Sequence, residues 1–310
     1  KVGHFEAAKL EVEMAKWIAC GRGPIYMNLM YMLHIFEQSV WGAIAGGVDG
    51  LIVGAGLPLD LPRVVAEAKR SLGVKREIAL IPIVSSVRAF KAICRKWWRS
   101  YRCLPDAVVL EGPLAGGHLG FKTTDNLDDS SFQLEFLLKE LLGEMPSIME
   151  ECGSPDSSIP VIVAGGIWDR ADILRFVGLG ASGVQIGTRF LATEESGASD
   201  DFKRAVVAAT KEDIGVVTNP GSPSGMPFRI LLDSPGYPKD DWGGVKRCDF
   251  RYMTHNGVCR AMGSCEFFCI CEGLWSAING PPEKAVYTVG ANRSEERRVG
   301  KECRSRWSSY

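Results

Sequence analysis

Short apolar runs alternate with longer amphipathic stretches along most of the chain. Each run is apolar almost throughout, rather than at every second position. This is the pattern of strands that are buried on both faces of a parallel sheet. The predicted strands are 24–30, 50–54, 78–84, 107–110, 160–164 and 183–187.

The stretches between these runs have helical spacing of their apolar residues. They predict helices over 62–73, 87–101, 132–145 and 170–179, and a further helical stripe covers the first residues up to Ile18. After Thr188 the pattern weakens. There we expect a polar helix over 200–211, a Pro/Gly-rich loop over 219–227 and a cysteine-bearing extension over 248–291, all wrapping one domain.

Regular alternation of strands and helices indicates an α/β protein, but it fits a closed barrel and an open doubly wound sheet alike. Glycine and polar residues cluster just after the predicted strands, where barrel enzymes build their active sites. This clustering favours a TIM (β/α)8 barrel. The first residues of the chain already form a helix, whereas a barrel of this class should begin with strands. We therefore expect an N-terminal truncation that leaves about six of the eight strands, in a single domain over 1–293. The clusters are 54–56, 111–112, 116–118, 165–166 and 187–188.

The last residues, 294–310, have neither helical nor strand periodicity. They resemble the in-frame translation of a sequencing-library adapter, with a genuine basic tail as the alternative, and we leave them out of the fold prediction.

Composition excludes several classes of protein. The net charge of -1 is the remainder of 36 basic and 37 acidic residues, so no broad field attracts nucleic acid or anionic lipid. No run approaches the roughly 18 apolar residues of a membrane helix. Ten cysteines in 310 residues fall below the density of a disulfide scaffold. We therefore expect a cytoplasmic protein without nucleic-acid or membrane partners.

The most specific motif combines Ala164-Gly-Gly-Ile167 with Gly187-Thr-Arg-Phe190, each after a predicted strand. Paired glycines let backbone N–H groups approach a phosphate, Thr188 adds a hydroxyl, and the N-terminus of a following helix adds positive partial charge. Tight turns alone would also explain the glycines. The Gly-Thr pair favours phosphate binding by Gly165, Gly166, Gly187 and Thr188.

A second motif, Glu111-Gly-Pro-Leu-Ala-Gly-Gly-His-Leu-Gly120, places His118 among glycines beyond a strand end. Glycine neighbours leave an imidazole little steric cover, which is not typical of a core histidine. With a pKa near 6.5, His118 can take a proton from a carbon acid or, as a cation, stabilise an anion. We predict His118 as the catalytic residue.

These motifs, together with Asn28, Gly54-Ala-Gly-Leu-Pro-Leu59 and Pro82-Ile-Val-Ser-Ser-Val-Arg-Ala89, occur in an order that resembles the nitronate monooxygenases and the related flavin-dependent enoyl-acyl-carrier-protein reductases. The resemblance spans roughly residues 5 to 293. It implies an FMN-dependent TIM barrel that oxidises alkyl nitronates with O2 to carbonyl compounds and nitrite.

The resemblance also implies roles for individual residues. Asn28 and Gly54 would line the flavin ring, the two glycine turns would hold its phosphate, and His118 would deprotonate a nitroalkane or hold the nitronate. Glu111, Gly116 and Gly117 are further candidates for contact with FMN.

Several alternatives stay open. Ser85 and Ser86 could bond flavin or substrate, but capping the next helix is at least as compatible with their position. Arg229 resembles a position near the substrate mouth, with a surface arginine as the other interpretation. The cysteines between 248 and 271 lack the paired C-x-x-C spacing of zinc sites, so we predict no metal.

Competing functions are an FMN-dependent NAD(P)H reductase of enoyl thioesters or quinones, and an inert fragment or metal-binding structural protein. The residues do not indicate an oligomeric state.

Overall fold

The computed structural model describes residues 3–33, 35–122, 125–217, 227–237, 246–247, 254–255, 258–259, 267–268 and 270–292. The predicted adapter tail and most of the Pro/Gly-rich loop lie outside these residues, as do Cys248, Cys265 and Cys269.

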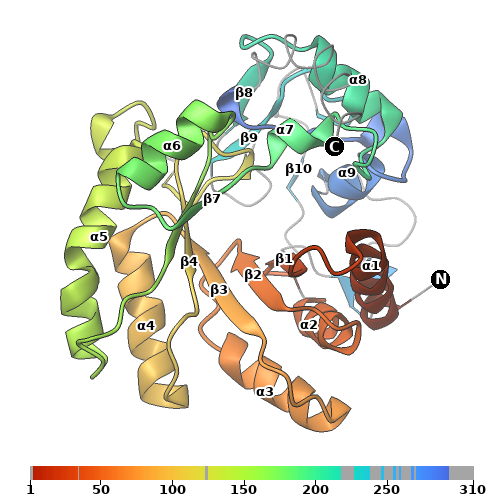
Figure 1. The fold of residues 1–310 in the computed structure, drawn as a ribbon. Helices are drawn as coiled ribbons and strands as arrows, with labels where there is room; N and C mark the ends of the chain where they lie inside the picture. The colour runs from red at the N-terminus through yellow and green to blue at the C-terminus, as the bar shows by residue number, and fades with distance from the viewer. Residues whose placement is uncertain are drawn as a thin grey trace.

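A six-stranded sheet forms the first part of the molecule (Figure 1). All five neighbouring pairs in it are parallel, in the order β1-β2-β3-β4-β6-β7. The prediction of six parallel strands is confirmed, but only the four central strands are largely buried, because the edge strands β1 and β7 have no fully buried residue. The strands are β1 (Tyr26–Met30), β2 (Gly50–Gly54), β3 (Ala79–Val84), β4 (Val108–Glu111), β6 (Val161–Ala164) and β7 (Gly183–Gln185).

The sheet is strongly curled. Asn28 on β1 and Gln185 on β7 belong to the two opposite edge strands, yet both border the same cavity. A flat sheet of this width would hold them far apart, because neighbouring strands are spaced about 4.8 Å apart. The fold is therefore a parallel half-barrel with its strand ends gathered around one site, which agrees with the predicted barrel class.

Helices cover the outer face of the half-barrel (Figure 1). The predicted helices are present with small shifts at their ends, whereas α2 was not among the helices singled out from the sequence. The elements are α1 (His4–Ala19), α2 (Phe36–Ala45), α3 (Leu61–Leu72), α4 (Val87–Tyr101), α5 (Leu134–Glu151) and α6 (Arg170–Gly178).

The helix predicted to end at Met145 continues through Pro146 to Glu151. Proline removes one backbone hydrogen bond and disfavours a helix interior. Here the apolar stripe continues beyond it, because Met145, Ile148 and Met149 are all buried against the main core. Burial of these large side chains outweighs the cost of the proline.

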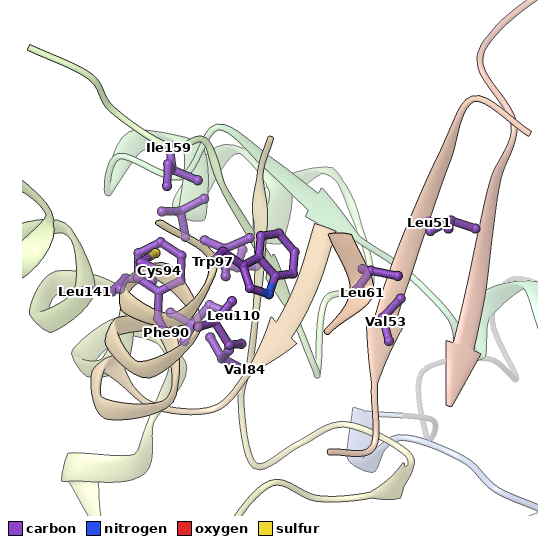
Figure 2. Packing of buried hydrophobic residues seen from close by; sticks show 14 of the residues in the cluster. Leu51, Val53, Leu61, Val84, Phe90, Cys94, Trp97, Leu110, Leu141 and Ile159 are labelled. Carbon is purple, nitrogen blue, oxygen red and sulfur yellow. The ribbon is translucent and has the colours of Figure 1, made fainter. Parts of the chain in front are cut away.

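The main hydrophobic core lies between the sheet and its helices. Phe90, Cys94 and Trp97 of α4 pack there with Val84 and Leu110, which come from β3 and β4 (Figure 2). A smaller cluster fills the inner face of the sheet, and it consists of Ile81, Ala107, Val109 and Ala164. Alternate strand residues thus face two apolar layers, which explains why the strands are apolar throughout.

The second part of the described chain adds an antiparallel sheet in the order β5-β9-β8, which the sequence analysis did not predict. Its strands are β5 (Gly117–His118), β8 (Ile214–Val217) and β9 (Phe228–Leu231). The predicted polar helix is α8 (Asp200–Ala208), and the other helical elements are η1 (Ser130–Phe132), α7 (Thr188–Leu191), α9 (Ile270–Ser276) and η2 (Pro282–Lys284).

Short pairings complete the described elements. Strand β10 (Lys246–Arg247) pairs with β13 (Phe267–Phe268), and β11 (Thr254–His255) pairs with β12 (Val258–Cys259).

This second part has hydrophobic clusters of its own. One joins α8 to the segment before residue 290 through Phe202, Val206 and Tyr287, and another is built around Phe228 and Ile230 of β9. Neither is continuous with the core of the half-barrel. Within the residues that the structure describes, no helix has the length and apolar character needed to cross a membrane.

Candidate active site

Two adjoining cavities lie at the carboxyl ends of the parallel strands. The apolar cavity, of about 210 Å³, is lined by Met30, Met32, Leu33, Ala55, Gly56, Leu57, Ile83, Val84, Ser85, Ser86, Ala89, Glu111, His118, Leu119 and Gly120. The polar cavity, of about 300 Å³, is lined by Asn28, Glu111, Leu114, Ala115, Gly116, Ala164, Gly165, Gly166, Ile167, Trp168, Gln185, Gly187, Thr188, Leu191, Thr288, Gly290 and Asn292. Glu111 borders both.

The two glycine turns that were predicted to share a phosphate meet in the polar cavity. Gly165 and Gly166 follow β6, while Gly187 and Thr188 follow β7, the neighbouring strand. Gly165 and Gly166 have φ of 96° and 78°, a conformation that residues with a side chain rarely adopt. The sequence motif therefore folds into two turns that border one cavity.

Unused hydrogen-bonding groups line this cavity. In the described part of the chain, the backbone N–H groups of Gly165, Gly166 and Gly187 have no hydrogen-bond acceptor. The same holds for the side-chain amides of Asn28 and Gln185. None of these residues is fully buried, and Asn28 and Gly187 are exposed, so the cavity is open and its donors are accessible to a polar ligand.

Residues near the end of the described chain close the polar cavity. The Gly290 amide donates to Thr188 Oγ1 over 2.9 Å, and Asn292 Nδ2 donates to the Gly166 carbonyl over 2.6 Å. The hydroxyl hydrogen of Thr188 stays available to a ligand. The expected contribution of a following helix is corrected, because α7 has only four residues and provides little dipole.

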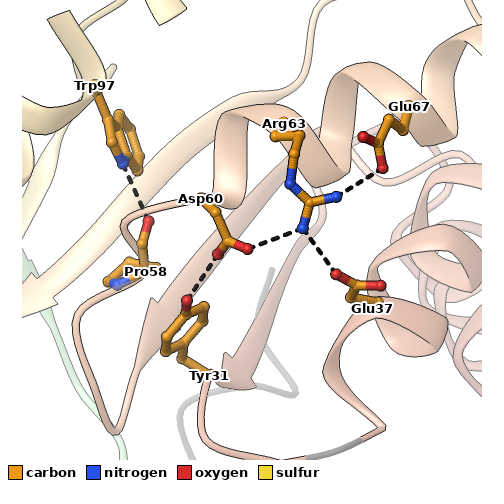
Figure 3. Close-up of polar contacts among 7 residues, drawn as sticks. All are labelled: Tyr31, Glu37, Pro58, Asp60, Arg63, Glu67 and Trp97. Atoms are coloured by element: carbon orange, nitrogen blue, oxygen red, sulfur yellow. Dashed lines mark hydrogen bonds and ion pairs between the residues drawn. The ribbon is translucent and has the colours of Figure 1, made fainter. Parts of the chain in front are cut away.

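The loop after β2 forms one wall of the apolar cavity, and polar contacts hold it in place (Figure 3). Asp60 accepts hydrogen bonds from Tyr31 over 2.7 Å and from Arg63 over 2.9 Å, while Trp97 Nε1 donates to the Pro58 carbonyl over 3.0 Å. Burial and the bond to Asp60 raise the pKa of Tyr31 to about 12. Tyr31 therefore stays protonated and keeps this contact.

One residue of this wall has a strained backbone. Ala55 has φ of 51°, in the left-handed region, and borders the apolar cavity next to Gly56 and Leu57. Such a conformation costs a non-glycine residue about 1 kcal/mol or more and is common at ligand sites. The surrounding contacts compensate for this strain and give the cavity wall its shape.

His118 lies on β5 and borders the apolar cavity. Its register partner on β9 is Phe228, whose ring centroid lies 4.6 Å from that of the imidazole. Burial lowers the pKa of His118 to about 4. This corrects the expectation of a pKa near 6.5: at neutral pH the ring is uncharged, so it offers a hydrogen-bonding group or a base and not a cation.

Glu111 is the last residue of β4 and lies beside Ala164 of β6. Its side chain keeps some accessible surface toward the cavities, but protein atoms enclose the rest. Burial raises the pKa of this carboxyl to about 8, so it is mostly protonated at pH 7. With His118 uncharged as well, both titratable side chains that line the cavities are mostly neutral at that pH among the described residues.

Ser85 and Ser86 make different contacts at the start of α4. Ser86 Oγ accepts a hydrogen bond from the Ala89 amide over 3.3 Å as the N-cap of α4, so the capping alternative is confirmed for this residue. Ser85 is buried and borders the apolar cavity, and the cap bond is made by Ser86 instead. Contact of either hydroxyl with substrate stays a prediction.

Arg229 borders neither cavity, and it is half-buried. Its guanidinium donates to the carbonyls of Pro113 and Ala115 over 2.8 and 3.1 Å. It therefore holds the loop after β4, which lines the polar cavity. Gly54 and Gly117 also lie outside both linings: Gly54 packs closely on Ile83, and Gly117 forms a turn with φ of 75°.

Several cavity residues were absent from the sequence prediction. Gln185 had a usable signal, because it is a polar residue within an apolar strand. Trp168, Thr288, Gly290 and Asn292 reach the polar cavity only through tertiary folding, and Asn292 lies next to the segment that we had set aside.

The cysteine cluster that invited a metal interpretation lies outside the described residues, apart from the backbone of Cys259 and Cys271. Among the residues whose side chains are described, no group of three or more His, Cys, Asp or Glu is placed to hold a metal ion.

Comparison of the sequence with those of known proteins finds relatives that are described as nitronate monooxygenases. The "probable nitronate monooxygenase" of Staphylococcus haemolyticus is 43% identical over 112 residues, which are 35% of this chain and 27% of that protein. The matched segments thus span between a quarter and a third of the first such relatives.

Two solved structures share the fold. FabK from Thermotoga maritima has a TM-score of 0.59 at 22% identity, over 96% of this chain and 84% of that one. A nitroalkane oxidase from Streptomyces ansochromogenes has a TM-score of 0.56 at 18% identity, over 99% and 88%. The model of the nitronate monooxygenase family matches residues 41–234. This match covers more than half of the sequence, so the chain belongs to the nitronate monooxygenase family.

Proposed function

We propose that this protein is an FMN-dependent nitronate monooxygenase that oxidises alkyl nitronates with O2 to a carbonyl compound and nitrite. The observation that carries the proposal is the pair of adjoining cavities, one apolar and one lined by free hydrogen-bond donors, with His118 on the apolar side and Glu111 between them. The polar cavity suits a phosphate-bearing cofactor, and the apolar cavity beside it suits the alkyl group of a small substrate.

The residues present fit this cofactor. The free amides of Gly165, Gly166 and Gly187, with the Thr188 hydroxyl, would hold the phosphate by hydrogen bonds. A Cβ on Gly187 would meet no atom within 4 Å, so the backbone there is open to a ligand. Asn28 and Gln185 would face the more central part of the cofactor. When bound, FMN would accept electrons from the nitronate and pass them to O2.

The remaining steps belong to the protein. Apolar side chains such as Met30, Leu57 and Leu119 would exclude water around the substrate carbon and its alkyl group. The uncharged imidazole of His118 would hold the nitronate oxygens by hydrogen bonding, or take the proton from a nitroalkane before oxidation. No described carboxylate would repel the substrate anion, because Glu111 is largely protonated.

Flavin spectroscopy tests the proposal. FMN is titrated into the purified protein and its fluorescence is followed, and propyl nitronate is then added without oxygen. We expect FMN to bind, its visible absorbance to bleach, and nitrite to form when air is admitted. His118→Gln should bind FMN but bleach more slowly by a factor on the order of 10² or more. His4→Gln, a matched change on α1 outside both cavities, should behave like the wild type.

Two outcomes would overturn the proposal. Rapid bleaching by NAD(P)H with no response to nitronate would identify a reductase of enoyl thioesters or quinones instead. Failure to bind FMN, together with stoichiometric zinc, would support a metal-binding structural protein.

A further inference from the structure

Glu111 is a buried carboxyl group that the proposed chemistry leaves without a task. It borders both cavities. No described residue donates a hydrogen bond to its carboxyl group or forms an ion pair with it. A buried carboxylate without a partner is costly, so the neutral acid is the stable form, and a neutral acid carries one O–H donor.

None of the described groups around Glu111 favours the charged form of its carboxyl group. Ile83 and Val84 of β3, which line the same cavity, and Ala164 of β6, the register partner of Glu111, are apolar. From β5 comes His118, which is uncharged. From β9 comes Arg229, whose guanidinium is occupied by two loop carbonyls and borders neither cavity. Within the described chain, no Lys, Arg or Asp lines either cavity to compensate a negative charge.

We propose that Glu111 acts as a protonated hydrogen-bond donor at the junction of the two cavities and makes the apolar cavity selective for planar anions with a short alkyl chain. Its O–H would donate to an anionic oxygen of the ligand, as the nitronate group provides. This inference rests on the proposed function and adds a specificity-determining residue to it. The donor and the ligand exchange no electrons, and the proton stays on Glu111.

The proposal has a consequence that depends on pH. Once Glu111 loses its proton, it stops donating and places a negative charge beside the anion. Binding of an anion above the pKa of Glu111 then requires uptake of one proton, so the apparent Kd rises about tenfold for each pH unit. The Kd of a neutral ligand of the same shape should change little. His118 titrates at far lower pH and does not contribute in this window.

Butyrate and butyramide provide the matched probes, because they share a shape and differ in charge. Their Kd values are measured by calorimetry on the FMN-loaded protein between about pH 6 and pH 10, where butyrate stays ionised. We expect butyrate to weaken about tenfold per pH unit above about pH 8 and butyramide to stay within about twofold. In Glu111→Gln, which keeps a donor and cannot ionise, the pH dependence of butyrate should vanish.

Glu150→Gln is the control, since Glu150 is exposed on α5 and borders neither cavity. It should reproduce the wild-type pH profile. A butyrate Kd that is independent of pH in the wild type would overturn the proposal, as would a profile that persists in Glu111→Gln.

Infrared spectroscopy of the cofactor-free wild type tests the protonation of Glu111 directly. This measurement needs neither bound cofactor nor a folded variant. The protonated carboxyl band of a buried acid should be present in the cofactor-free wild type at about pH 6.5 and lost at about pH 9.5. Absence of that band at the lower pH would overturn the role of Glu111 even if FMN and nitronate behave as proposed. Loss of FMN binding with the band retained would overturn the proposed function alone.

Discussion

Replacement of Gly116 by alanine tests the close contact that forms one side of the polar cavity. A Cβ at this position would lie 2.5 Å from the Val289 carbonyl carbon and 2.8 Å from the Gly290 nitrogen. Both are backbone atoms, so no side chain can rotate away. Relief requires the loop around Gly116 and the strand-like segment around Val289 to separate by several tenths of an ångström.

The surrounding bonds oppose this separation. The Ala291 amide donates to the Leu114 carbonyl over 3.0 Å, and Arg229 ties the same loop to β9 through Pro113 and Ala115. Overpacking of this kind costs about 1–3 kcal/mol. In a domain of this size, each kcal/mol lowers Tm by roughly 2–4 °C, so we expect a loss of several degrees.

Thermal and urea unfolding of Gly116→Ala would be compared with Gly187→Ala. Gly187 borders the same cavity, but its added methyl group would meet no atom within 4 Å. We expect Gly187→Ala to keep wild-type stability and to weaken FMN binding, because the methyl group occupies space for the ligand. Equal stability of Gly116→Ala and the wild type would refute the contact between the loop and Val289.

Three further changes probe other parts of the molecule. Because folding raises the pKa of Glu111 from 4.5 to about 8, the wild type loses unfolding free energy as pH rises between these two values. The free energy of unfolding of Glu111→Gln, measured in urea, should therefore rise relative to that of the wild type by at most about 1.4 kcal/mol per pH unit. An equal dependence on pH in both proteins would contradict this. Trp97→Phe removes the fully buried hydrogen bond to Pro58 and should cost about 2 kcal/mol, which unchanged urea unfolding would disprove. Ser86→Ala removes the N-cap of α4 and should cost about 1 kcal/mol without raising KM for nitronate; a raised KM at unchanged stability would instead indicate a substrate contact.

The sequence predicted the half-barrel well, because strands buried on two faces have a distinctive composition. Ile81 and Val109 face the inner cluster while Val84 and Val108 face the helices, so each strand is apolar throughout. The glycine turns at Gly165 and Gly187 were also visible, since both follow strands and neighbouring parallel strands end at one edge. These local signals identified four phosphate candidates, Gly165, Gly166, Gly187 and Thr188, and all four border one cavity.

Tertiary effects account for what was missed. The pKa of His118 depends on burial against Phe228, which is 110 positions away in the sequence and contributes nothing to the local motif. The role of Arg229 depends on two carbonyls across the fold. The strands β8 and β9 have four residues each, and β5, which pairs with β9, has two, so periodicity over a window of ordinary length could not predict them.

The separate hydrophobic clusters of the two parts of the molecule have a thermodynamic consequence for the cofactor. The hydrogen bond from Asn292 to Gly166 crosses from the second part to the turn after β6, and residues of both parts line the polar cavity. A molecule held there contacts both parts at once and binds only when they are docked. At a hundredfold excess over its Kd, such a molecule adds about 2.7 kcal/mol to the docked state, so cofactor supply would govern the lifetime of the protein as well as its chemistry.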